Sequence, residues 1–337
     1  MPSTLLVGGY GAVGSQIART LASKPENHVI VAGRNLTKAA AIGFGARRID
    51  LGAPPTWADA LEGIDLVVAS IDQKDTAFVS EVTRRGIGYI DVTAGDDFFR
   101  HVEALEVRTP VVLSLGLAPG LSNLLSAAAA KQLDVVESIE IGILMGTGDD
   151  HGSAAIAWST RNMFDPKAPR DDARISFGPD FGMRQAHFMD FADQHVLART
   201  MPGVRTVTRV TYDSAMLSGL LFWLGRTFAG NATMQALVER ISHMPTLGSD
   251  KCVLSVTAHG KRASRPVAQD AFFFGRREAA VTAAVAALAA EDVLAGRVPP
   301  GIHHSHQVLD GQAIFTALER LGHGRVQFSD LRPEGGI

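Results

Sequence analysis

Short apolar runs alternate with segments of helical periodicity along the first third of the chain. The apolar runs predict buried strands at residues 5–7, 28–32, 64–70, 87–92 and 110–114. A more polar run at residues 46–50 fits a short third strand. The segments between them predict helices, at residues 13–21, 36–42, 57–61, 76–85 and 98–106. Strands that alternate with helices in this way are typical of a parallel sheet covered on both faces.

The pattern changes beyond Gly116. Further strands are predicted at residues 138–145, 206–212, 251–258 and 270–275, and helices at residues 121–133, 216–228, 233–241, 277–294 and 311–321. Strands separated by such long helical or irregular stretches indicate a mostly antiparallel sheet in an α+β domain.

The glycine-rich turn that joins the first strand to the first helix carries the strongest functional signal. It consists of Gly9, Tyr10, Gly11, Ala12, Val13 and Gly14. In a strand, turn and helix of this kind, Gly9 allows the tight turn, Gly11 lets the backbone approach a pyrophosphate, and Gly14 lets the helix pack against the strand. The helix start offers free N–H groups and the positive end of its dipole. We therefore expect a dinucleotide here.

The end of the second predicted strand indicates which dinucleotide binds. An NAD-binding protein usually carries an acidic residue there for the ribose 2′-hydroxyl, whereas this chain has Gly33, Arg34 and Asn35. A guanidinium can hold a 2′-phosphate bidentately. We expect NADP(H), with Arg34 and Asn35 on the phosphate and Asp50 near the adenine. The alternative is that Arg34 is an ordinary solvated residue.

Three loops at the carboxyl ends of later strands are expected to surround the nicotinamide, because ligands of open parallel sheets bind at that edge. The loops cover residues 70–74, 93–97 and 115–122. In the first of them, Ser70, Ile71 and Asp72 are expected to line the cofactor.

Composition narrows the choice of function. With 337 residues, 46% of them hydrophobic, the chain is long enough for two domains. A net charge of -3 and a pI of about 6.4 argue against a nucleic acid or an anionic membrane as partner. The chain enters its first strand directly, so we expect no targeting segment, a cytoplasmic location and a small-molecule substrate. The lone Cys252 is expected in the core.

Four local patterns make the chain resemble the saccharopine dehydrogenase-like family, in the branch of saccharopine reductases and carboxynorspermidine dehydrogenases. They are the opening glycine turn, a glycine, aromatic and aspartate strand, a Pro-Gly hinge, and a final helix and turn, at residues 8–14, 86–92, 116–123 and 282–300. The resemblance implies NAD(P)-dependent oxidoreduction, often of a C=N bond formed between an amine and a carbonyl compound. Some relatives reduce other double bonds, including enoyl groups. By the same analogy we expect a homodimer.

Candidate catalytic residues follow the predicted strands. A carboxylate at Asp91, beside Thr93, would favour an iminium, and Lys74 can reach a ribose hydroxyl or a substrate carboxylate. Asp96 is a weaker candidate, and the alternative for these carboxylates is ordinary loop capping, in which Asp97 caps the helix at Phe98. The alternative interpretation is that Lys74 is an ordinary solvated lysine.

The polar, glycine-rich loop 146–153 of the second domain is a further candidate. It offers His151 as an acid or base, with Arg161 nearby to pair a substrate acid group, although a plain connection is equally compatible with the pattern. His303, His304 and His306 lack the carboxylate or cysteine partners of a metal site, so no metal is expected.

The sequence thus predicts an α/β chain with three parts. An NADP-binding Rossmann domain with a doubly wound parallel sheet spans residues 1–116, an α+β substrate and dimerisation domain with a mostly antiparallel sheet spans 117–300, and a segment at 301–337 packs back on the first domain. The expected activity is NADPH-dependent reduction of the imine bond of a small metabolite. The alternatives are reduction of an activated C=C or C=O bond, or a sensor that binds NADP(H) without catalysis.

Overall fold

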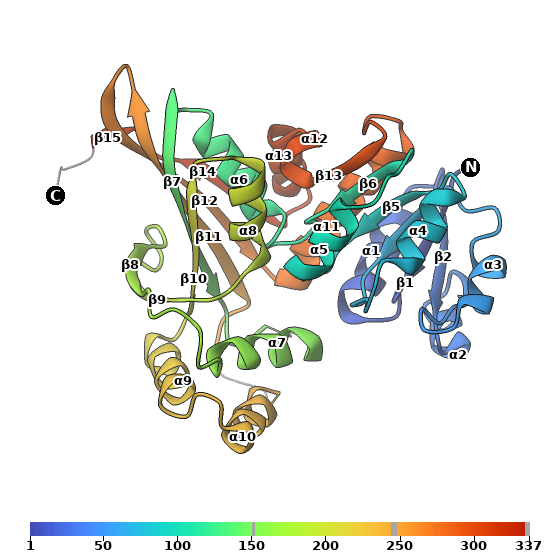
Figure 1. The fold of residues 1–337 in the computed structure, drawn as a ribbon, viewed down its shortest axis with the longest axis horizontal. Helices are drawn as coiled ribbons and strands as arrows, with labels where there is room; N and C mark the ends of the chain where they lie inside the picture. Colours follow the sequence, from blue (N-terminus) through green and yellow to red (C-terminus); the bar gives the residue numbers. More distant parts are fainter. Residues whose placement is uncertain (150–151, 244–247, 334–337) are drawn as a thin grey trace. The chain divides into compact units, whose positions relative to one another are not determined.

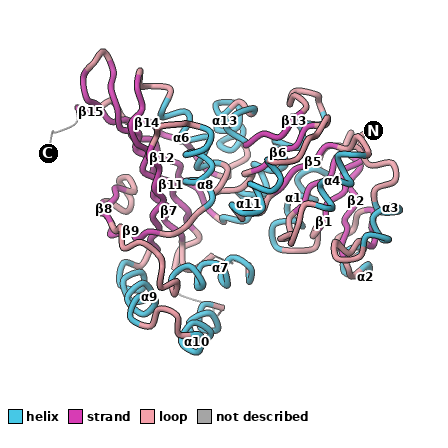
Figure 2. The backbone as a smooth tube through the Cα atoms, viewed as in Figure 1, coloured by secondary structure: helices cyan, strands magenta, loops and turns pink. Residues whose placement is uncertain are grey.

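The computed structural model describes residues 1–149, 152–243 and 248–333. The chain divides into two compact units, each built around one sheet (Figures 1 and 2). The first unit comprises residues 1–124 and 279–318, and the second comprises residues 125–278 and the segment from 319 onward.

The first unit contains a seven-stranded, entirely parallel sheet with the strand order β13-β6-β5-β4-β1-β2-β3. Its strands are β1 (Ser3–Val7), β2 (His28–Gly33), β3 (Gly45–Arg48), β4 (Leu66–Ala69), β5 (Gly88–Asp91), β6 (Pro110–Leu113) and β13 (Gly301–His304). The central strands β1 and β4 are almost continuously apolar and buried, as expected of a parallel sheet covered on both faces. The predicted doubly wound sheet is confirmed.

Most helices of the first unit follow the predicted positions closely, and two short helices, at residues 54–56 and 305–308, were not predicted. The helices of this unit are α1 (Ala12–Ala22), α2 (Leu36–Ala40), η1 (Pro54–Thr56), α3 (Trp57–Ala60), α4 (Ala77–Arg84), α5 (Asp96–Glu103), α11 (Glu278–Leu294), α12 (Ser305–Val308) and α13 (Gly311–Arg320). Of these, α11 is rich in alanine and buried along most of its length, which is the pattern of a helix enclosed by other elements rather than of a surface helix. Helix α6 (Leu121–Ala130) begins in the first unit and ends in the second, and the last two residues of α13, Glu319 and Arg320, also belong to the second unit.

Strand β13 was not predicted. It pairs in parallel with β6, in a register that places His304 beside Leu113. Ile302 is its one aliphatic side chain, so no apolar run marks it in the sequence. It is a strand because the edge of β6 supplies its hydrogen-bond partners, which local sequence cannot reveal.

The second unit contains a mixed sheet with the order β14-β12-β11-β7-β10-β9-β8, and β15 also pairs with β12. Its strands are β7 (Val135–Met145), β8 (Ala173–Ser176), β9 (Met183–Phe188), β10 (Arg205–Tyr212), β11 (Lys251–Arg262), β12 (Arg265–Arg276), β14 (Gly324–Phe328) and β15 (Arg332–Pro333). Only the β7–β10 pair is parallel among the described strands of this sheet, so the expected mostly antiparallel α+β domain is confirmed.

The connection between β7 and β10 holds elements that periodicity missed. It carries α7 (Ser153–Met163), β8, β9 and α8 (Ala192–Thr200), and the helices α9 (Ala215–Thr227) and α10 (Ala232–Ser242) follow β10. In β9 buried and exposed positions do not alternate regularly, so the two-residue period that marks a strand is absent. Gly142 on β7 admits this hairpin, because a Cβ atom there would lie 2.9 Å from Ile175 and 3.0 Å from Phe177.

The lone cysteine lies where its surroundings in the sequence predict it. Cys252 is a free thiol with 1% of its surface exposed, and it lies in the core of the second sheet as expected. Within the described ranges, no helix combines the length and apolar character that a bilayer crossing requires.

Candidate functional site: the glycine turn and the strand ends of the first sheet

The glycine turn closes tightly over the end of β1. Gly8 adopts a φ of 81°, and its N–H donates to the carbonyl of Ala32, 2.9 Å away. The left-handed conformation that the turn requires thus falls on Gly8, and the tight-turn role predicted for Gly9 is corrected by one residue. Gly9 is required for space instead, because a Cβ atom there would lie 2.8 Å from the Leu6 carbonyl oxygen.

Gly14 lies where α1 passes closest to the turn. A Cβ atom at Gly14 would be 2.5 Å from the Gly8 carbonyl oxygen and 2.7 Å from Ser70 Oγ. Ser70 is itself fixed, since its Oγ donates to the Val7 carbonyl at 3.0 Å. The helix therefore approaches the ends of β1 and β4 at a distance that only glycine permits, as the spacing of the motif predicts.

The start of α1 has backbone N–H groups that can bind an anion. Its N-cap is Gly11, which offers no side-chain cap, and the first intrahelical bond runs from Ser15 N to Gly11 O at 3.0 Å. The N–H groups of Ala12, Val13 and Gly14 precede that bond, so the helix itself gives them no acceptor. Gly11 is exposed. Backbone donors, a positive helix end and no side chain at Gly11 fit the diphosphate of a dinucleotide.

The end of β2 presents two exposed arginines. Arg34 is exposed, and among the described residues its guanidinium has no hydrogen bond or ion pair. The parallel register places Arg48, at the end of β3, beside Gly33. Arg48 is exposed as well, and we did not single it out from the sequence because it lay inside a predicted strand. Tyr10 packs on Gly33, where a Cβ atom would be 2.5 Å from its ring.

Asn35 and Asp50 are held by their own loops. The Asn35 side chain caps α2, with Oδ1 accepting from the Lys38 N–H at 3.0 Å. Asp50 Oδ1 accepts from the Gly52 N–H at 3.0 Å, and its backbone carbonyl accepts from Trp57 Nε1 at 2.9 Å. Both residues therefore shape the strand ends beside Arg34, and the Asn35 oxygen is already engaged.

Asp91 ends β5 in a buried hydrogen-bond network. Its Oδ2 accepts from the Tyr89 hydroxyl at 2.6 Å and from Gln73 Nε2 at 3.2 Å. Its Oδ1 accepts from the Thr93 N–H at 2.8 Å and from the Thr93 hydroxyl. Asp91 is fully buried, whereas Thr93 and Gln73 are half-buried. Asp91 therefore reaches the surroundings through Thr93 and Gln73.

Burial raises the pKa of Asp91 to about 6, and the nearby charge of Asp72 acts in the same direction, although hydrogen bonds from Thr93 and Tyr89 oppose the shift. A carboxyl group with a pKa near 6 can carry a proton at one pH and release it at a slightly higher one. Burial also raises the pKa of Tyr89 well above its usual value, so its hydroxyl stays protonated and donates to Asp91.

The loop after β4 contributes exposed groups. Ile71 packs on the glycine turn, with its Cγ2 atom 2.4 Å from the position of a Cβ atom at Gly8, and is 37% exposed. Asp72 and Lys74 are exposed to solvent. The loop after β5 differs from our expectation. Helix α5 begins at Asp96 with Gly95 as its N-cap, so the alternative in which Asp97 caps this helix is wrong.

Asp96 is engaged as well, in an ion pair with Arg100 at 2.8 Å. This pairing follows from helical geometry, since the two residues lie four positions apart in α5. Asp96 therefore has a structural partner beside the strand ends.

The polar loop of the second unit is only partly described. Thr147 Oγ1 donates to Asp213 Oδ1 at 2.9 Å, which ties the loop to the residue that follows β10. His151, the predicted acid or base, lies outside the described residues. Trp158 and Arg161 lie in α7, where the Trp158 ring meets Phe191 edge to face at 4.6 Å.

The histidine cluster forms a buried cross-link in the first unit. His304 Nδ1 lies 2.8 Å from Ser114 Oγ, and its Nε2 lies 2.9 Å from Glu103 Oε1. These contacts join β13, the end of β6 and α5. Across the described residues, no group of three or more His, Cys, Asp or Glu side chains is placed to hold a metal ion. Sequence reasoning missed this link because its partners lie far apart along the chain.

Comparison with known proteins extends this description. No family model matches the chain. The structure is similar to apo saccharopine dehydrogenase (L-Glu forming) from Saccharomyces cerevisiae, with a TM-score of 0.72, 16% sequence identity, and coverage of 98% of this chain and 100% of that one. It is also similar to an amine dehydrogenase from Mycobacterium smegmatis, with a TM-score of 0.50, 12% identity, and coverage of 92% and 96%.

A curated relative matches a short part of the sequence. Prestalk A differentiation protein A from Dictyostelium discoideum is 39% identical over 70 residues, which cover 19% of this chain and 23% of that protein. The two structural similarities cover nearly the whole chain at low identity, so they show the fold. The chain has the fold of saccharopine dehydrogenase, which confirms at the level of fold the resemblance predicted from its motifs.

Proposed function

We propose that the chain is an NADPH-dependent oxidoreductase that reduces the C=N bond of a small metabolite. The observation that carries the proposal is the position of the glycine turn. The turn places the start of α1, which has no side-chain cap, next to two exposed arginines at the ends of β2 and β3. The turn and helix start fit a diphosphate. Arg34 and Arg48 fit an additional phosphate on the adenosine ribose, which favours NADP(H) over NAD(H).

The bound nicotinamide supplies a hydride, and the protein must supply orientation and a proton. In the proposed reaction the substrate carbon gains the hydride and the nitrogen gains a proton, so an imine becomes an amine. When Asp91 is protonated, it can donate to Thr93 Oγ1, which frees the Thr93 hydroxyl hydrogen for the substrate nitrogen. Asp91 is then a positioning and proton-supplying residue, and Thr93 is the group that contacts the substrate. Lys74 is proposed to bind a substrate carboxylate.

The preference for a carbon–nitrogen bond is supported by the fold comparison. One similar structure is that of an amine dehydrogenase. The pKa of about 6 at Asp91 suits a proton donor that works below neutral pH. The amine dehydrogenase comparison favours an imine over the alternative, an activated C=C or C=O bond, whose reduction would use the same proton donor.

Cofactor choice tests the proposal first. Replacing Arg34 with serine is expected to weaken NADPH binding by about 10- to 100-fold, because a charge-assisted contact to phosphate is lost. Binding of NADH should change less than about twofold. Titration of NADPH fluorescence measures both. The matched control is Arg19→Ser, which removes an exposed arginine of α1 and should leave both affinities unchanged.

Equal binding of NADPH and NADH by the unaltered protein would contradict the NADP(H) assignment. Turnover is tested separately, by following NADPH oxidation with mixed aldehydes and amines. NADPH binding without oxidation of any such mixture would instead favour a sensor.

The expected homodimer remains part of the proposal, and the outer face of α9 supports it. Met216, Leu220 and Trp223 lie one turn apart on that helix and are 85%, 50% and 58% exposed. An apolar stripe of this kind is typical of a contact surface. Trp223→Glu is expected to convert a dimer into a monomer in light scattering after size-exclusion chromatography. A monomer before substitution would exclude the dimer.

A further inference from the structure

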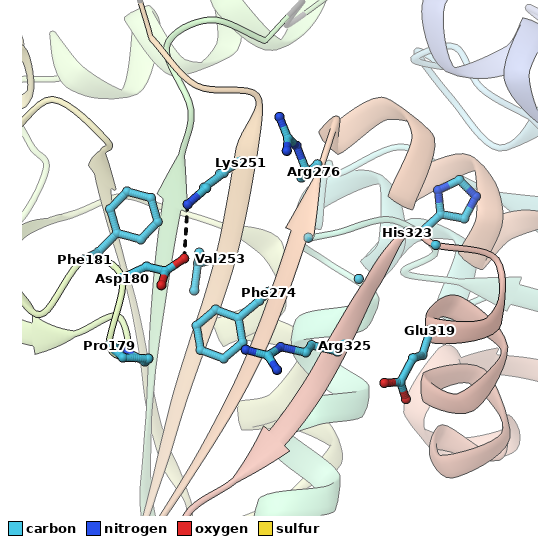
Figure 3. A pocket seen from close by; sticks show the side chains of 13 residues that line it. Pro179, Asp180, Phe181, Lys251, Val253, Phe274, Arg276, Glu319, His323 and Arg325 are labelled. Carbon is cyan, nitrogen blue, oxygen red and sulfur yellow. Dashed lines mark hydrogen bonds and ion pairs between the residues drawn. The ribbon is translucent and has the colours of Figure 1, made fainter.

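A pocket of about 390 Å³ opens on one face of the second sheet, and the proposed function does not use it. It lies entirely within the second unit, between the β8–β9 connection and the ends of β11, β12 and β14 (Figure 3). Its volume is within the range of sites that hold small metabolites.

The strand register builds the base of the pocket. Val253 on β11 lies opposite Phe274 on β12, and Phe274 lies opposite Arg325 on β14. One row further along, Lys251 lies opposite Arg276. Residues two apart on a strand share a face, so apolar and cationic side chains are collected on the same side of the sheet.

Two phenyl rings line the pocket, and each is accompanied by a cation. The guanidinium carbon of Arg325 lies 5.6 Å from the centre of the Phe274 ring, and Lys251 Nζ lies 5.3 Å from the centre of the Phe181 ring. Figure 3 shows Arg325 beside Phe274, and Lys251 beside Phe181 with its Nζ joined to the Asp180 carboxylate. These are cation–π distances, which keep the charged groups next to flat apolar surfaces.

Glycine backbone forms part of the pocket wall. The loop before Phe181 lies directly on the Phe274 ring, because a Cβ atom at Gly178 would be 2.6 Å from that ring. Gly275 and Gly324 also line the pocket, and a Cβ atom at either would lie 2.5 Å from the Phe273 ring, which is on the opposite face of the sheet from Phe274. At these two positions the pocket wall is therefore backbone, and the absence of a side chain makes room for Phe273 on the other face.

Charge pairing identifies Arg325 as the group available to a ligand. Lys251 pairs with Asp180 at 3.1 Å, and Arg276 pairs with Asp250 at 2.7 Å. Arg325 contacts Phe274, and among the described residues no ion pair joins it to Glu319, the other acidic group of the lining. An arginine stacked on a ring retains its outer N–H donors for a carboxylate.

We propose that this pocket binds a small aryl carboxylate, with the ring against Phe274 and Phe181 and the carboxylate on Arg325. The proposal does not rest on the cofactor or on the proposed reaction. Benzoate, benzamide and cyclohexanecarboxylate are suitable probes, because they separate the carboxylate from the flat ring. Binding to the full chain without cofactor is measured by ligand-observed NMR, so failure here leaves the proposed oxidoreductase function untouched.

Benzoate is expected to bind at least about fivefold more tightly than either benzamide or cyclohexanecarboxylate. Arg325→Gln should weaken benzoate about fivefold and leave benzamide unchanged, since Arg325 is exposed and its contribution is moderated by solvent. Phe274→Leu should weaken both aromatic probes. The control Arg262→Gln alters an exposed arginine at the far end of β11 and should change nothing.

Thermal unfolding of Arg325→Gln shows whether the fold is retained, which is expected for an exposed side chain. Equal affinity for benzoate and benzamide, an unchanged benzoate affinity in Arg325→Gln, or no binding of benzoate at about 10 mM would each overturn the proposal.

Discussion

Replacing Gly14 with alanine is expected to lower the affinity for NADPH by about 100-fold, because the added methyl group displaces the phosphate-binding turn. The new Cβ atom would lie 2.5 Å from the Gly8 carbonyl oxygen, 2.7 Å from Ser70 Oγ and 2.9 Å from the Gly9 Cα. Two of these atoms are backbone, so the contact cannot be relieved by rotating a side chain. Either α1 or the turn must move, and the N–H groups at the helix start move with it. Fluorescence titration measures the affinity.

The matched control is Gly219→Ala. Gly219 also lies within a helix, but a Cβ atom there would meet nothing within 4 Å. Alanine is the better helix former, so this variant should gain up to about 1 kcal/mol of stability and bind NADPH normally. Gly14→Ala should in addition lose about 1–3 kcal/mol in urea unfolding. Unchanged NADPH affinity in Gly14→Ala would show that the turn is not the phosphate site.

Replacing Asp91 with asparagine is expected to change how stability depends on pH. The folded-state pKa of Asp91, about 6, exceeds the ordinary value of 3.8 for an aspartate, so the folded protein holds this proton more tightly than the unfolded chain does. The stabilisation that the folded protein gains by holding this proton is complete below the pKa of Asp91 in the unfolded chain. It is lost as pH rises through about 6. Between pH 5 and 7.5 this loss amounts to about 1–2 kcal/mol. Urea unfolding at both pH values measures it.

The difference in stability between Asp91→Asn and the unaltered protein should therefore shift by that amount in favour of the variant as pH rises. Asp97→Asn is the control, since Asp97 is an exposed carboxylate of the neighbouring helix. Parallel pH profiles for Asp91→Asn and the unaltered protein would disprove the raised pKa. If the proposed proton supply is correct, kcat/KM for imine reduction falls above pH 6, and Asp91→Asn removes this dependence.

In the first unit, patterns of adjacent residues predict the strand, turn and helix that form the candidate dinucleotide site. Strand β1, the glycine turn and α1 were predicted nearly to the residue, because an apolar run, a glycine cluster and a helical repeat are each written in consecutive positions. The turn itself was assigned to Gly9, whereas Gly8 adopts the positive φ. Both residues are glycine, so the sequence alone does not distinguish which one turns the chain.

Contacts between distant residues of the candidate site could not be predicted from patterns of adjacent residues. Asp91 was placed correctly at the end of its strand, but its burial and its contacts with Gln73 and Tyr89 arise from packing between neighbouring segments. Arg48 became a candidate only when the register set it beside Gly33. Likewise, His304 meets Ser114 and Glu103 from about 190 and 201 positions away.

By itself, the sequence determined the α/β class, the order of the main strands and helices up to residue 113, and the position of the dinucleotide turn, because periodicity and glycine spacing are properties of adjacent residues. The tertiary structure alone decided that residues 301–304 form a strand, that β7 and β10 run parallel, and that Val253, Phe274 and Arg325 share one row. Strand pairing joins distant segments through backbone hydrogen bonds that carry little side-chain signature, so only the assembled sheet reveals these neighbours.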